Sequence, residues 1–142
     1  MGQYGFIYRL VFLYIEPLLA LSGSYLTHFA PQNYISRVVP SAANDPITTA
    51  TQLAMSNLAA MYVHFAIMEA ILLRVTNDRK VWHIVLAGTV VSDVLHLWII
   101  YHARGAVEWD FGKQGDWEVF ATSYVPLGLR LAFLAGFDGW TE

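Results

Sequence analysis

The sequence contains no cysteine, which excludes disulfide bonds, thiolate nucleophiles and cysteine-ligated zinc sites. Charged residues are also scarce, at 13% of the chain, about half the share that is usual in soluble proteins. Acidic residues outnumber basic ones, and the net charge of −3 without a basic stretch argues against a nucleic-acid partner. A glycine-rich phosphate-binding loop is missing as well, so no nucleotide-binding motif is present.

Apolar residues, by contrast, make up 56% of the 142 residues and gather in four runs. The runs cover residues 6–25, 52–73, 81–101 and 117–137. Each is about 20 residues long, and a helix of that length rises about 30 Å, the thickness of the hydrocarbon core of a bilayer. The sequence therefore predicts an all-α protein, a four-helix transmembrane bundle that forms a single domain over residues 1–142.

The first run has a second interpretation, as a cleaved signal peptide that ends at Ala20-Leu21-Ser22. The Glu16-Pro17 pair in the middle of its apolar part argues against cleavage. We therefore expect a retained span.

Four spans place both termini and the polar turn at residues 74–80 on one side of the membrane. That side carries four basic residues and the other side three: Arg9, Arg74, Arg79 and Lys80 against Arg37, Arg104 and Lys113. The positive-inside rule then favours cytosolic termini.

Ionisable residues lie inside these apolar runs, where they are costly and normally face a bundle interior or a water-filled cavity. Three are carboxylates and two are histidines: Glu16, Glu69, Asp93, His64 and His96. Each is therefore a candidate for a functional site.

The depth of these groups can be estimated at about 1.5 Å per helical residue, counted from the side of the termini. Side chains from all four helices then fall in one layer at roughly 15–22 Å: Glu16, His64, Asp93, His96 and Tyr124. Arg130 and Glu69 come nearer the surface, at roughly 10 and 7 Å. The layer predicts a shared polar chamber near the middle of the bilayer.

Helical spacing groups some of these residues on common faces. Asp93 and His96 are about one turn apart and share a face of the third span. Asn57, Met61 and His64 repeat at helical spacing and form a polar stripe on the second. Both faces are expected to line the chamber.

Pro17 follows Glu16 directly and has no backbone N–H to donate. The carbonyl one turn earlier, at Phe12 or Leu13, is therefore freed from the helical pattern. A kink or a trapped water at this point would widen the chamber around Glu16.

The carboxylates have a structural interpretation beside the functional one. Glu16 and Asp93 could form a buried ion pair with Arg130 that only holds the bundle together, and Glu69 is expected to pair with Arg74. However, one deep arginine cannot neutralise three acids, so we expect at least one of them to carry a proton. A protonated carboxyl beside an ionised one is the arrangement that separates a general acid from a general base.

The histidines and the tyrosine also leave alternatives open. His96 could be a base oriented by Asp93, or it could be satisfied by a carbonyl or a serine. His64 is more often a packing residue at such a position, and Tyr124 could either offer its phenol to the chamber or pack. Asp93, His96 and His64 could form a metal site, but they come from separate helices without a tight motif. We therefore expect no metal and no cofactor.

Several segments resemble a fungal family of small four-span membrane proteins, and the likeness covers nearly the whole chain. They are Tyr8-Arg9 with Ile15-Glu16-Pro17, the stretch from Leu72 to Trp82, Ser92-Asp93-Val94-Leu95-His96-Leu97, and Arg130 followed by Ala132–Gly136. The resemblance implies a fungal endomembrane protein, here expected in the endoplasmic reticulum. Some proteins of this kind are membrane-bound hydrolases or cyclases that act on epoxides in polyketide or terpenoid pathways.

The sequence and the resemblance together lead to a functional hypothesis. We expect a cofactor-independent epoxide hydrolase or cyclase, with a lipophilic substrate that arrives from the lipid bilayer. Glu16, Asp93 and His96 are the expected catalytic residues. A second set is expected to bind the substrate: Asn57, His64, Tyr124 and Arg130.

The opposing hypothesis is a non-catalytic membrane protein that binds lipid or assembles with a pathway enzyme. A proton-coupled carrier is a third class, which the lack of an inverted repeat makes weaker. Association with a second copy of the chain stays open under each hypothesis.

Overall fold

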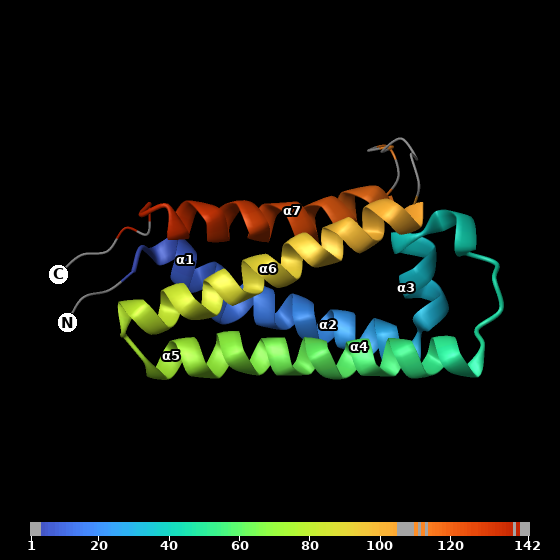
Figure 1. Ribbon diagram of the computed structural model, residues 1–142, viewed down its shortest axis with the longest axis horizontal. Helices are drawn as coiled ribbons and strands as arrows, with labels where there is room; N and C mark the ends of the chain where they lie inside the picture. The colour runs from blue at the N-terminus through green and yellow to red at the C-terminus, as the bar shows by residue number, and fades with distance from the viewer. Residues whose placement is uncertain (1–3, 105–109, 111, 113, 138, 140–142) are drawn as a thin grey trace.

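The computed structural model describes residues 4–104, 110, 112, 114–137 and 139. Lys113, one of the basic residues counted for the membrane orientation, lies outside these residues. The described part is all-α and contains no strand. Four long rods run side by side (Figure 1). The first rod joins α1 (Phe6–Leu10), the π-helix η1 (Val11–Ile15) and α2 (Glu16–Phe29), and the second joins α4 (Thr49–Ile67), the π-helix η3 (Met68–Leu72) and α5 (Leu73–Val75). The third and fourth are α6 (Arg79–Arg104) and α7 (Gln114–Leu134).

Three of the described helices are long and apolar enough to cross a membrane: Phe6–Phe29, Thr49–Val75 and Arg79–Arg104. They match three of the four apolar runs predicted from the sequence, with slightly wider bounds. The fourth predicted span corresponds to α7, which is not among them. Although α7 has 21 residues, Glu118, Pro126 and Arg130 interrupt its apolar sequence. Length and apolar composition therefore support three of the four predicted spans, and α7 is not supported by them alone.

The rods form two pairs, with α2 packed on α4 and α6 packed on α7. Figure 1 shows α6 crossing the bundle, from a start beside α5 to an end beside α7. The two pairs consequently move apart toward the end where α2 stops. There the short helix α3 (Pro31–Val38) and the turn η2 (Pro40–Ala42) lie across the bundle, and α3 contacts both α2 and α7.

The opposite end of the bundle is filled by aromatic side chains. The Tyr4 and Trp82 rings lie 4.4 Å apart, and Phe133 of α7 contacts Tyr4, Tyr8 and Trp82 with ring centroids 4.9–5.9 Å apart. The indole N–H of Trp82 donates to the carbonyl of Thr76 at 3.0 Å. This end is therefore solid, and both the start of α1 and the end of α7 lie here.

Ion pairs fix α3 in place across the other end. Arg104 of α6 is buried, donates from Nε to the carbonyl of Val38 at 2.7 Å and forms an ion pair with Asp116 of α7. Arg37 of α3 forms a second, partly exposed ion pair with Glu118 of α7. The C-terminal carbonyl of α3 is thus capped by a guanidinium, which satisfies an acceptor that the helix itself leaves free.

Pro17 frees a backbone carbonyl, and the structure identifies it as that of Leu13. The Nη2 atom of Arg74 donates to the Leu13 carbonyl at 3.0 Å, and its guanidinium lies 4.7 Å from the centre of the Tyr14 ring. The prediction of a freed carbonyl at Phe12 or Leu13 is confirmed. The expected Glu69–Arg74 pair is wrong, because Arg74 binds the first rod instead.

We predict that Arg74→Met lowers the free energy of unfolding by about 1 kcal/mol, the net value of one such hydrogen bond. In a Pro17→Ala background the loss should be smaller, because residue 17 then offers its own N–H to the Leu13 carbonyl. A double-mutant cycle on unfolding in detergent measures the difference. Equal losses in both backgrounds would contradict the assignment.

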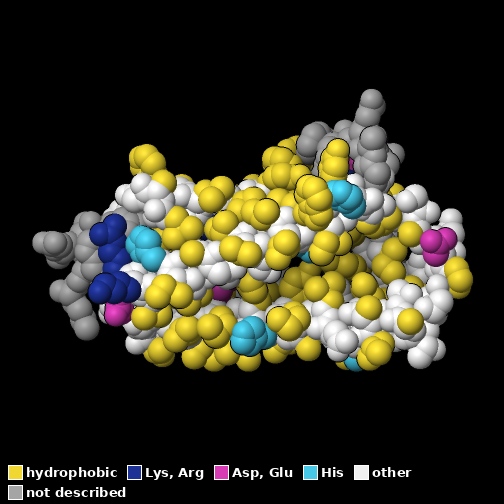
Figure 2. Space-filling view, viewed as in Figure 1, with side chains coloured by type: hydrophobic (Ala, Val, Ile, Leu, Met, Phe, Trp, Pro, Cys, Tyr) yellow, Lys and Arg dark blue, Asp and Glu magenta, His cyan; other side chains and the backbone are white. Residues whose placement is uncertain are grey.

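Compared with a soluble protein, the distribution of apolar and charged side chains between surface and interior is reversed. Large apolar residues cover the flank in Figure 2, and several are more than half exposed, such as Leu18, Leu53 and Trp98. Charged residues such as Glu69 and Arg130, in contrast, are buried. The exposed Lys and Arg side chains in this view gather at the end where α6 begins. This distribution is compatible with an integral membrane protein.

Candidate functional site

Arg130 of α7 is bound by three carboxylates, one from each of the other rods. It forms ion pairs with Glu16 at the start of α2, Glu69 in η3 and Asp93 in α6. The Arg130 Nη2–Glu69 Oε1 distance is 2.8 Å, and Nη2 also contacts Glu16, so these two carboxyl groups share one nitrogen. Arg130 lies 3% exposed and Glu69 0%, whereas Asp93 keeps 22% of its side-chain surface. The cluster thus joins all four rods.

Two π-helical segments position the glutamates. Glu16 directly follows η1, Glu69 lies within η3, and the two segments contact each other. A π-turn inserts an extra residue, so the side chains after it rotate relative to those before it, and such turns are frequent at functional sites. Pro17 is a sequence signal for η1, but no comparable signal precedes η3.

The cluster leaves polar atoms without partners within the described residues. Neither Glu16 Oε1 nor Glu69 Oε2 receives a hydrogen bond, and Arg130 Nε makes none. If all three acids were ionised, the cluster would carry a net charge of −2, because one guanidinium offsets only one carboxylate. A proton on one carboxyl group would lower that charge and add a donor beside the free oxygen atoms.

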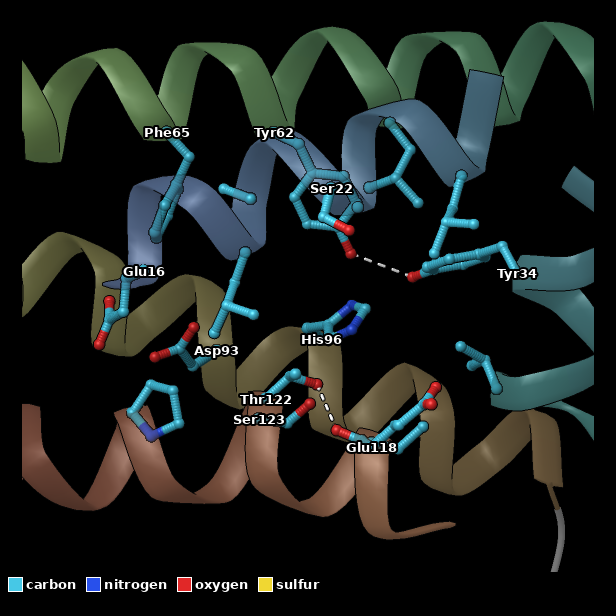
Figure 3. A pocket seen from close by; sticks show the side chains of 18 of the residues that line it. Glu16, Ser22, Tyr34, Tyr62, Phe65, Asp93, His96, Glu118, Thr122 and Ser123 are labelled. Carbon is cyan, nitrogen blue, oxygen red and sulfur yellow. Dashed lines mark hydrogen bonds between the residues drawn. The ribbon is translucent and has the colours of Figure 1, made fainter. Parts of the chain in front are cut away.

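A cavity of about 460 Å³ extends from this cluster toward α3. Figure 3 shows Glu16 and Asp93 at one end of its lining, His96 between the ends, and Tyr34 and Glu118 toward the other. Arg130 also lines the cavity and pairs with Glu16 and Asp93, and Arg37 lines it and pairs with Glu118. Leu26, Leu58, Ile100 and Val119 are among the apolar residues of its wall. This volume lies within the range of about 300–1,000 Å³ that is typical of small-molecule sites.

The cavity opens on the flanks of the bundle. Several of its lining residues are also exposed, and they come from all four rods: Leu19, Ser22, Met61, Ser92 and Thr122. Figure 2 shows the flank between α6 and α4 hollowed, with apolar side chains in the hollow. The separation of the two helix pairs produces this opening, because α4 contacts α2 and α6 contacts α7.

Four of the predicted site residues are brought together here. Glu16, Asp93, His96 and Arg130 line the same cavity, as a shared chamber requires. Within the described part of the chain, His96 has no hydrogen-bond partner, so its imidazole is available to a ligand; Figure 3 shows it pointing into the cavity.

The other three predicted residues lie elsewhere. Asn57, His64 and Tyr124 are exposed and do not line the cavity, and Tyr124 stacks on Phe120 with ring centroids 5.3 Å apart. On α4 the cavity face consists of Leu58, Met61, Tyr62 and Phe65. Asn57 precedes this face by one residue, which corresponds to a rotation of about 100° around the helix. The expectation that Asn57 and His64 face the chamber is therefore wrong.

Two tyrosines of the site were not predicted, and Glu69, a candidate in its apolar run, binds a different arginine from the one expected. Glu69 completes the charge cluster, although its estimated depth placed it near the surface. Tyr34 of α3 and Tyr62 of α4 line the cavity, and their hydroxyl groups lie 3.1 Å apart. Burial and the neighbouring Tyr62 raise the pKa of Tyr34, so it remains a neutral phenol. Gly23 of α2 allows the Tyr62 ring to approach closely, since an added Cβ would meet it at 3.3 Å.

The three residues considered as metal ligands are not brought together in the structure. The alternative set of Asp93, His96 and His64 is not assembled, because His64 faces away from the cavity. In the part of the chain that the structure describes, no group of three or more His, Asp or Glu residues is placed to hold a metal ion.

The chain was compared with known proteins. The searches of curated proteins and of solved structures found no match. Residues 3–140 match the family described as "Domain of unknown function (DUF7704)". Since this match covers nearly the whole sequence, the chain belongs to the DUF7704 family.

Proposed function

We propose that the protein is an integral membrane protein in which α7 joins the three apolar helices as a fourth span. The polar residues of α7 support this, because Arg130 faces the bundle interior and not the lipid. Both ends of the described chain and the basic residues Arg79 and Lys80 lie at one end of the bundle, which favours a cytosolic location for that end. The family resemblance supports placement in the fungal endoplasmic reticulum.

We further propose that the cavity opens an epoxide in a lipophilic substrate, of the polyketide or terpenoid kind, that arrives from the bilayer. The observation that carries this proposal is the cavity itself. It opens on the flanks of the bundle, and acid–base groups from α2 and α6, together with Arg130 of α7, form its inner end. An apolar wall with a few convergent polar groups is typical of sites that orient a small molecule.

The reaction needs one proton donor and one proton acceptor. A carboxylic acid of the cluster protonates the epoxide oxygen while the C–O bond breaks. The oxygen of a water molecule, or of a hydroxyl group in the substrate, forms the new bond to that carbon and releases its proton to the acceptor. The product is a diol or a cyclic ether with one new hydroxyl group. A proton then passes from the acceptor back to the carboxylate that donated one, through the shared cluster, and this restores the starting protonation of the site.

The geometry supports distinct roles for the residues. Asp93 and His96 face the cavity about one turn apart, so they are the proposed acceptor pair. Glu16 also lines the cavity, so its carboxyl group is the proposed source of the acidic proton, whereas the fully buried Glu69 shares Arg130 Nη2 with it but does not line the cavity. Arg130 positions the carboxyl groups and favours their ionised forms as protons leave.

A second candidate function is non-catalytic lipid binding. One observation favours it: Arg130 contacts all three carboxylates, as a purely structural cluster would. On this hypothesis Glu16→Gln and Asp93→Asn change stability or partner recovery, while no substrate is converted.

The test incubates membranes that contain the protein with isoprenoid and polyketide-derived epoxides in ¹⁸O-labelled water. We expect either a diol with one labelled oxygen or an unlabelled cyclic ether, and neither in membranes without the protein. Mass spectrometry distinguishes the two products. If an unrelated epoxide hydrolase converts the same epoxides in these membranes and this protein leaves them intact, the catalytic proposal is abandoned in favour of lipid binding.

A further inference from the structure

The end of the cavity away from Arg130 contains a pair of tyrosines. Tyr34 of α3 and Tyr62 of α4 both line the cavity, and a hydrogen bond of 3.1 Å joins their hydroxyl oxygens. In Figure 3 Tyr34 lies on the side of the cavity toward α3, beyond His96 as seen from Glu16 and Asp93, and Tyr62 lies across from His96. Apolar residues such as Leu26 and Leu58 line the same cavity.

One of the two hydroxyl protons of this tyrosine pair has no hydrogen-bond acceptor in the part of the chain that the structure describes. Each phenol has one O–H, and a single hydrogen bond between two phenols uses only one of them. The second O–H has no acceptor among the described residues. Since burial raises the pKa of Tyr34, its phenol does not ionise near neutral pH, and the spare proton is retained.

We propose that the Tyr34–Tyr62 pair donates a hydrogen bond to a neutral oxygen of the ligand, at a distance from the charge cluster. The nearby Arg37 is engaged by Glu118, so a neutral acceptor such as a hydroxyl, ether or carbonyl oxygen fits this end better than an anion. The ligand class is therefore a lipophilic molecule with oxygen functions at both ends. The assignment of the reacting end rests on the proposed function, but binding at the tyrosine pair does not.

The test uses three probes that share one isoprenoid chain: farnesol, farnesyl methyl ether and farnesene. Binding is measured with the full-length protein in lipid nanodiscs, with empty nanodiscs as background. We expect farnesol and its methyl ether to bind about three- to tenfold more tightly than farnesene, since both oxygens accept a hydrogen bond. None of the probes has an epoxide, so the result does not depend on the proposed reaction.

Variants of the pair make the test specific. Tyr34→Phe and Tyr62→Phe should each keep the preference for the oxygenated probes, because the remaining phenol then has a free O–H. The double variant should lose the preference and still bind farnesene, which also shows that it is folded. Equal binding of the three probes to the wild-type protein overturns the proposal, and so does a preference that survives in the double variant.

Discussion

Replacing Arg130 by leucine is expected to lower the free energy of unfolding by about 3–5 kcal/mol, the effect of removing one partner from a buried ion pair. The variant leaves the carboxyl groups of Glu16, Glu69 and Asp93 without the cation that they share. Arg130→Lys should recover only part of the loss, since a single ammonium lacks the planar fork of donors that reaches three acceptors. Unfolding midpoints in detergent provide the measurement.

Two comparisons make this prediction specific. Arg37→Leu removes an arginine from a partly exposed ion pair, so its effect should stay at about 0–1 kcal/mol. Adding Glu16→Gln, Glu69→Gln and Asp93→Asn to Arg130→Leu should restore stability in part, because no unpaired buried charge then remains. An Arg130→Leu protein as stable as the wild type would show that the cluster does not hold the rods together.

Replacing Asp93 by asparagine is expected to lower the rate of epoxide opening by at least about 100-fold, the usual contribution of a positioned acid or base. Asparagine keeps the size of the side chain and an oxygen for Arg130, but it cannot accept the proton of the incoming nucleophile. Because the change removes a negative charge from a cluster that is rich in them, we expect the protein to stay folded. Product formation in membranes measures the rate.

Glu69→Gln is the matched control for this prediction. Glu69 contacts the same guanidinium as Asp93, but it is fully buried and does not line the cavity. Its replacement should therefore retain most of the rate while it alters stability. If both variants lose activity equally, the loss reflects a disturbed charge cluster, and the specific role of Asp93 is contradicted.

Much of the architecture could be predicted from the sequence because it depends on local patterns. Apolar runs of about 20 residues place three helices within a few residues of their observed bounds. Pro17 predicts a freed carbonyl because a missing N–H acts on its own helix, whatever the neighbours are. The convergence of Glu16 and Asp93 also follows, since buried carboxylates must find a common cation or a polar cavity.

The depth in the bilayer that the sequence predicted for Glu69 was wrong, because all helices were assumed to start at one plane. Glu69 appeared shallow because its distance was counted from an assumed membrane boundary, with all helices upright. In the structure α6 crosses from one helix pair to the other, so residues at different estimated depths meet at Arg130. Tilt and axial offset result from packing between helices, and a count along one helix contains neither.

Which face of a helix points inward was likewise decided by the tertiary structure. Of the predicted stripe of Asn57, Met61 and His64, only Met61 belongs to the observed face, which also includes Leu58 and Tyr62. Lipid and core are both apolar, so the polar stripe with Asn57 and His64 does not mark the side of α4 that faces the bundle interior. The same holds for Tyr34, whose partner lies 28 residues away on another helix.

The sequence by itself thus determined the helices, the scarcity of charge and the presence of more buried acids than buried bases. The tertiary structure alone decided that Glu69 joins Glu16 and Asp93 at Arg130, that His96 faces an open cavity, and that Tyr34 meets Tyr62. The physical reason is that hydropathy and helix-breaking residues act along one chain segment. Rotation, tilt and the spacing of helix pairs, in contrast, depend on the contacts that all the segments make together.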